Sequence, residues 1–77
     1  MTKKQLQNFL VSFTTDRMTE YMVEDYGLEL SKALSFIYNS QTYSKLTATE
    51  NGLYSQSPEY VYELLEKEYN KKIALAG

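Results

Sequence analysis

The chain has 77 residues, enough for one domain with a single hydrophobic core, and we predict one helical domain over residues 1–77. It has neither cysteine nor histidine, which excludes disulfide bonds and the usual zinc ligands, so we expect no metal and no cofactor. The net charge of −2 argues against non-specific nucleic-acid binding, and no window approaches the ~18 apolar residues of a membrane-spanning helix. These features favour a cytoplasmic protein, with which the lack of cysteine is consistent.

The first predicted element is one long helix over residues 3–26. Two sets of apolar residues follow the helical spacing i, i+3, i+4 and i+7, or nearly so, the second displaced by one position: Leu6, Phe9, Leu10 and Phe13, then Met18, Tyr21, Met22 and Tyr26. No glycine or proline separates the two sets, which favours one helix with a drifting stripe over two helices. Thr2 is predicted as the N-cap and Gly27 as the left-handed residue that ends the helix.

The middle of the chain predicts two shorter helices. The first covers residues 29–39, with Leu30, Ala33, Leu34 and Ile37 on one stripe. A short third helix over residues 41–48 would be capped by Ser40 and would bury Tyr43 and Leu46, although its Thr-rich end favours a helix less. The Asn51-Gly52 pair after it is a turn signal.

The last predicted helix begins at Ser57, an N-cap candidate, with Pro58 at the first helical position. Its apolar stripe consists of five residues: Tyr60, Val61, Leu64, Leu65 and Tyr69. The tail over residues 73–77 is expected to fray. The fold class is therefore all-α, a small bundle of three main helices plus one short helix, whose central core residues we predict as Leu10, Leu34, Ile37 and Leu64.

The sequence contains no recognisable catalytic or small-molecule site, and we predict that the protein is not an enzyme. The commonest general base and the strongest nucleophile, histidine and cysteine, are both missing. Asp16, Glu20 and Glu24 form an acidic stripe on one helix face. Such a stripe is a solvated face, a docking surface for a basic partner, or a metal site, in that order of preference.

The tyrosines are the unusual feature, because the chain has eight of them and no tryptophan. Tyr60 and Tyr62 lie about 200° apart around a helix, so both cannot face the same core, and we predict that Tyr62 is at least partly exposed. One interpretation is that exposed tyrosines have no role. The other is that Tyr62, with Tyr38 or Tyr54, forms a patch that binds another protein or a second copy of the chain.

Two segments, YMVEDYGLELSKALSFIYNS and LYSQSPEYVYELLEKEY, carry a resemblance to a group of short, uncharacterised bacterial helical proteins. The shared order is a long helix ending at Tyr-Gly, a middle apolar helix, a tyrosine-containing loop and an amphipathic last helix, over roughly residues 6–69. Some members of that group are thought to be encoded beside a toxin-like partner. The resemblance implies an interaction role and carries over no functional residue.

We therefore predict a small protein–protein interaction module, or an accessory, antitoxin-like subunit, without catalytic activity. The alternative is a small DNA-binding transcriptional regulator, because a helix-turn-helix fits this length. A recognition helix needs Arg, Lys, Asn or Gln on an exposed face near its N-terminus, and the predicted second helix offers only Lys32 there. Basic residues converging on one helix would favour the regulator, and an apolar, tyrosine-rich surface would favour the module.

Overall fold

The computed structural model describes residues 1–76, apart from the side chain of Thr49, and every element within that part is helical. The α-helices are α1 (Lys3–Tyr26), α2 (Leu30–Tyr38), α3 (Gln41–Thr47) and α4 (Pro58–Ala76). Two short 3₁₀ helices, η1 (Thr49–Asn51) and η2 (Leu53–Ser55), connect α3 to α4. The predicted all-α fold is confirmed, including the short helix α3.

Helix α1 runs without a break for 24 residues because both of its ends are capped locally. The Thr2 hydroxyl accepts a hydrogen bond from the Gln5 backbone N–H at 3.1 Å, and the Gln5 side chain accepts one from the Thr2 N–H at 2.8 Å. This capping box satisfies two backbone donors of the first turn. At the other end Gly27 adopts the left-handed conformation with φ 64°, which a residue with a Cβ rarely adopts.

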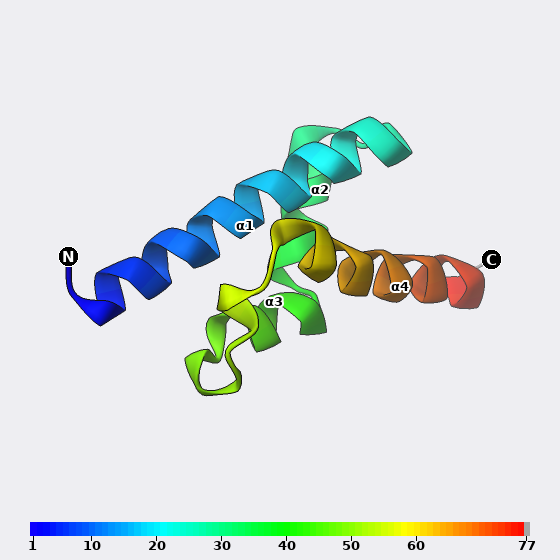
Figure 1. Cartoon of the computed structure of the whole chain (residues 1–77). Coiled ribbons are helices and arrows are strands. Elements are labelled where there is room, and N and C mark those ends of the chain that lie inside the picture. Colours follow the sequence, from blue (N-terminus) through cyan, green and yellow to red (C-terminus); the bar gives the residue numbers. More distant parts are fainter. Residues whose placement is uncertain (77) are drawn as a thin grey trace.

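The molecule is elongated, measuring 44 × 21 × 18 Å, because the N-terminal half of α1 and the C-terminal part of α4 extend to opposite ends of it (Figure 1). The buried apolar side chains form one cluster to which all four α-helices contribute: Met18, Met22, Ala33, Ile37, Leu46, Val61, Tyr62 and Leu65. The residues that α1 contributes both lie in its C-terminal half. The N-terminal half of α1 projects beyond this core.

The observed core differs from the predicted core because α4 is rotated about its own axis by about one residue position. Leu64 was expected at its centre, but Leu65 is fully buried and Leu64 only half-buried. In the same way Tyr62 is buried and Tyr60 is exposed. Neighbouring helical residues point about 100° apart, so an error of one position exchanges the core face for its flank.

The other three predicted core residues differ in how deeply they are buried. Ile37 is fully buried, as expected. Leu10 and Leu34 are only half-buried, so the prediction that they are central is wrong. At the C-terminal end, α4 continues through Ala76 with exposed side chains over residues 73–76, where the sequence predicts a frayed tail over 73–77. Gly77 lies outside the described residues.

Helix α3 has only seven residues, and two side chains cap its first turn. The Ser40 hydroxyl accepts a hydrogen bond from the Tyr43 N–H at 3.0 Å, as predicted. From α4, the Glu68 carboxylate accepts hydrogen bonds from the backbone N–H groups of Gln41 and Thr42 at 2.8 and 3.1 Å. Partial burial works to raise the pKa of Glu68, but these hydrogen bonds outweigh it and lower that pKa.

Candidate protein-interaction surface

The largest apolar side chains on the projecting half of α1 face outward. We call Leu6, Phe9, Leu10 and Phe13 the α1 stripe. Leu6, Phe9 and Phe13 are 46, 56 and 45% exposed, and Leu10 is half-buried. The rings of Phe9 and Phe13 stack with centroids 6.3 Å apart and planes inclined by 16°. Single exposed apolar residues are ordinary, whereas a contiguous set on one helix face is a candidate interaction surface.

The position of the α1 stripe follows from helix geometry. Leu6 and Met18 are twelve residues apart, and at about 100° per residue they point in directions about 120° apart. The set around Met18 and Met22 faces the core, so the set around Leu6 cannot face it as well. The displacement seen in the sequence was therefore informative: it separates an inward-facing set from an outward-facing one.

Threonines occupy the buried face where the two halves of α1 meet. Thr14, Thr15 and Thr19 are buried, and the last two have their hydroxyls satisfied within the helix. The Thr15 hydroxyl donates to the Val11 carbonyl at 2.7 Å, and the Thr19 hydroxyl donates to the Thr15 carbonyl at 2.8 Å. These small side chains let neighbouring elements approach α1 without exposing an unpaired polar atom.

The outer face of α1 changes from apolar to acidic along its length. Glu20 and Glu24 lie seven and eleven residues after Phe13, within about 20° of the same direction. Both glutamates and Asp16 are exposed. The three carboxylates predicted from the sequence as an acidic stripe therefore continue the line of the α1 stripe.

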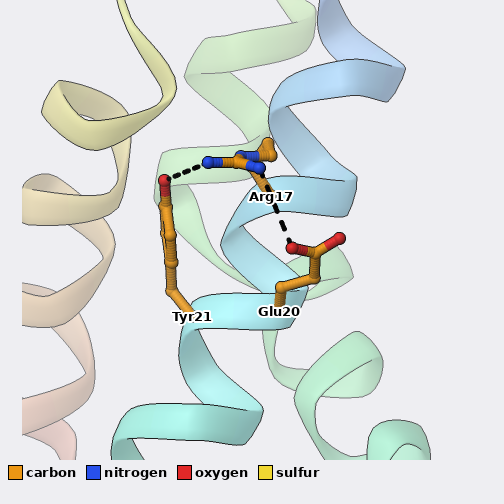
Figure 2. Close-up of polar contacts among 3 residues, drawn as sticks. All are labelled: Arg17, Glu20 and Tyr21. Atoms are coloured by element: carbon orange, nitrogen blue, oxygen red, sulfur yellow. Dashed lines mark hydrogen bonds and ion pairs between the residues drawn. The ribbon is translucent and has the colours of Figure 1, made fainter.

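Arg17 lies within the acidic part, between Asp16 and Glu20, and its charge is already engaged. Its guanidinium donates a hydrogen bond to the Tyr21 hydroxyl at 3.0 Å and pairs with the Glu20 carboxylate at 4.0 Å (Figure 2). The guanidinium carbon is also 5.4 Å from the centroid of the Tyr21 ring. Tyr21 in turn packs on Tyr62, with ring centroids 4.9 Å apart. Arg17 therefore adds a polar contact to an aromatic pair that joins α1 to α4.

Tyr62 is not the exposed docking residue that its spacing suggested. It is 7% exposed, and its hydroxyl donates a hydrogen bond to the Asp25 carboxylate at 2.8 Å. Burial first, and then the hydrogen bond to Asp25, raise the pKa of the Tyr62 phenol. The argument that Tyr60 and Tyr62 cannot share a face was sound, but the assignment was reversed. A tyrosine can enter a core when its hydroxyl finds an acceptor, which spacing alone does not show.

The other two candidate tyrosines lie on separate elements. Tyr38, at the end of α2, is 54% exposed and packs edge-on against Tyr43, with centroids 5.1 Å apart. Tyr54, in η2, is half-buried, and its hydroxyl accepts a hydrogen bond from the Gln7 side chain at 3.1 Å. This last contact holds η2 against the inner side of the projecting half of α1.

Other kinds of site have little support within the described part of the chain. No group of three His, Cys, Asp or Glu residues there could hold a metal ion, and no described helix is long and apolar enough to cross a membrane. An open groove of about 250 Å³ lies between α3 and α4. Lys45, Lys67 and Lys71 line it, together with the Glu68 carboxylate that caps α3.

Comparison of the chain with protein families, with curated proteins and with solved structures finds no match. The likeness to short bacterial helical proteins therefore stays a prediction carried by the two quoted segments.

Proposed function

We propose that this protein is a protein–protein interaction module that binds through the α1 stripe and has no catalytic activity. The observation that carries the proposal is the exposure of Leu6, Phe9 and Phe13 on a single face of a capped helix. The spacing i, i+3, i+4 and i+7 is the one by which a helix docks its apolar face against a partner. An accessory or antitoxin-like subunit of the bacterial cytoplasm is the role that this proposal includes.

Preorganisation supports this proposal. The stripe lies on a helix whose first turn is closed by the Thr2–Gln5 capping box, and its other side is held by the Gln7–Tyr54 hydrogen bond. A partner would therefore meet a stripe whose backbone is already helical. Binding then costs less conformational entropy than it would for a segment that folds on contact.

The alternative, a DNA-binding regulator, has weaker support. Three basic residues, Lys45, Lys67 and Lys71, line the groove between α3 and α4. Glu68 lies in the same groove, and its carboxylate reduces the positive potential that phosphates would need. On α1, two phenylalanines and a leucine are exposed on one face, which favours the interaction module.

The test compares stripe variants with a matched control. Immobilised wild-type protein, the double variant Phe9→Ala/Phe13→Ala and the control Tyr38→Ala are each exposed to an extract of the producing cells. Tyr38 is as exposed as Phe9 and lies on another helix, so it controls for loss of an exposed ring. We expect wild type and Tyr38→Ala to retain the same proteins and the stripe variant to lose them. Equal retention of the bound proteins by all three would contradict the proposal. If only Tyr38→Ala lost them, the interaction surface would be the one around Tyr38.

A further inference from the structure

We infer that the groove between α3 and α4 binds a short acidic segment of a partner protein, in which carboxylates flank one apolar side chain. We call it the lysine groove: its walls carry Lys45 on α3 and Leu64, Lys67, Glu68 and Lys71 on α4. None of these residues belongs to the α1 stripe, so the inference goes beyond the proposed function and names a second binding site.

Lysines from two helices converge on this groove. Lys67 and Lys71 are four residues apart on α4 and therefore project side by side, while Lys45 lies in the last turn of α3. The fold thus brings together three of the eight basic residues of a chain whose net charge is −2. Within the described part of the chain, none of the three forms an ion pair. Their charges are therefore available to an acidic partner.

The carboxylate of Glu68 in the same groove is already bound by the protein. It accepts hydrogen bonds from the backbone N–H groups of Gln41 and Thr42 at 2.8 and 3.1 Å, and from the Thr42 hydroxyl at 2.9 Å. These contacts hold both carboxylate oxygens at the start of α3. The groove is left with three ammonium groups against one carboxylate, so its net charge complements an acidic ligand.

The extent of the positive surface favours a short peptide segment over a nucleic acid. Lys67 and Lys71 span about 6 Å along α4, which is one helical turn. Beyond Lys67, the next hollow is lined by Glu63 and Glu66, which would repel a phosphate backbone that continued in that direction. A nucleic acid needs a basic surface that follows several phosphates, whereas a peptide needs only a few carboxylates at the groove.

Leu64 gives the lysine groove an apolar wall. The sequence predicts this residue in the core, but it is only half-buried, and it lines the groove. The methylene stems of the lysines extend the apolar surface while their ammonium groups remain in water. An apolar side chain of the ligand can therefore pack on Leu64 while carboxylates on either side of it reach the lysines.

The first measurement is the fluorescence anisotropy of a labelled peptide in which pairs of glutamates flank one leucine, titrated with the full chain. Because the groove is open and its lysines are exposed, we expect saturable binding in the high micromolar range that weakens as salt is raised. A control peptide with glutamine in place of every glutamate should not bind. Equal binding of the two peptides, or no binding of the acidic one at millimolar protein, would overturn the inference.

A pair of double variants tests whether the lysines of the groove are responsible. Lys67→Ala/Lys71→Ala should weaken binding of the acidic peptide about tenfold, roughly threefold for each exposed ion pair lost. The control Lys3→Ala/Lys4→Ala removes the same charge from another hollow, at the start of α1, and should bind like the wild type. All four lysines are exposed, so both variants should keep the circular-dichroism spectrum of the wild type. Equal weakening in both would show attraction to overall charge and would overturn the groove.

The position of the ligand can be measured without any substitution. In a titration of the isotopically labelled chain with the acidic peptide, the backbone amide resonances of residues 41–45 and 64–71 should shift most. Shifts confined to α1 would overturn the inference.

A short DNA duplex, tested at the same salt concentration, distinguishes the kind of ligand. We expect it to bind more weakly than the acidic peptide. Tighter binding that is lost in Lys67→Ala/Lys71→Ala would overturn the peptide ligand and favour the DNA-binding regulator. The stripe variant Phe9→Ala/Phe13→Ala should bind the acidic peptide like the wild type, so the lysine groove and the α1 stripe can each fail without the other.

Discussion

The two halves of α1 have the same apolar periodicity and opposite environments. In the C-terminal half, Met18 and Met22 are fully buried and form the centre of the core. In the N-terminal half, Phe9 and Phe13 are about half exposed and stack on each other. One continuous helix therefore serves first as an outward-facing surface and then as part of the core. The difference shows that helical amphipathicity specifies a face, while the neighbouring elements decide whether that face is covered.

The covering elements are distributed unequally along α1. Helices α2 and α4 both pack against α1, and the aromatic pair Tyr21–Tyr62 joins α1 to α4 in the packed half. The projecting half contacts η2, held by the hydrogen bond from Gln7 to Tyr54. A short 3₁₀ helix covers one side of α1 and leaves the stripe uncovered.

The largest expected effect contrasts one substitution in each half. Met18→Ala removes a fully buried side chain and should cost about 2–5 kcal/mol of unfolding free energy. Phe9→Ala removes an exposed side chain of greater volume and should change that free energy by no more than about 0.5 kcal/mol. Urea unfolding monitored by circular dichroism at low protein concentration measures both. Similar losses for the two variants would break the comparison.

A smaller effect is expected at the contact that joins the packed half to α4. Tyr62→Phe keeps the buried ring and removes the hydroxyl that donates to Asp25, and should cost about 1 kcal/mol. The control is Tyr60→Phe, which changes an exposed tyrosine on the same helix. Its melting temperature should equal that of the wild type. If both variants are equally stable, the Tyr62–Asp25 hydrogen bond does not contribute to holding α1 on α4.

The smallest expected effect depends on pH and concerns the support of the packed half by α3. Because the pKa of Glu68 is lower in the folded state, ionised Glu68 contributes stability that is fully present above its unfolded pKa of about 4.5. That contribution is lost as the pH falls through the lowered, folded-state pKa. As the pH falls below about 5, the free energy of unfolding should therefore decrease more for the wild type than for Glu68→Gln. Parallel stability curves for the two proteins would contradict this role.

The elements of the fold could be predicted from the sequence because their signals are local. Thr2, Gly27, Ser40 and Pro58 act on backbone groups within a few residues of themselves, and each defines a helix end as expected. The rotation of each helix is not a local property. Leu64 and Leu65 are equally apolar, and which of them is buried depends on elements distant in the sequence.

The interaction surface that we propose differs from the one that the sequence indicated. The sequence suggested a patch of Tyr62 with Tyr38 or Tyr54, whereas the proposed α1 stripe is made of phenylalanine and leucine. The residues were noted as a helix stripe and one of them, Leu10, was assigned to the core, since apolar residues at helical spacing usually face inward. The signal that could have distinguished them was the displacement between the sets around Leu6 and Met18, because both cannot face one core on a straight helix.

The carboxylate of Glu68 at the start of α3 has a consequence for the order in which the new chain folds. A helix of seven residues is not stable alone, and here its first N–H groups depend on a residue that the ribosome adds 27 positions after Gln41. Helix α1 carries both of its caps within residues 2–27 and is synthesised first. The set around Met18 and Met22 therefore receives part of its cover from α2 and the rest only when α4 is made, while the α1 stripe stays exposed throughout. Until α4 is made, both faces of α1 are available to bind other chains.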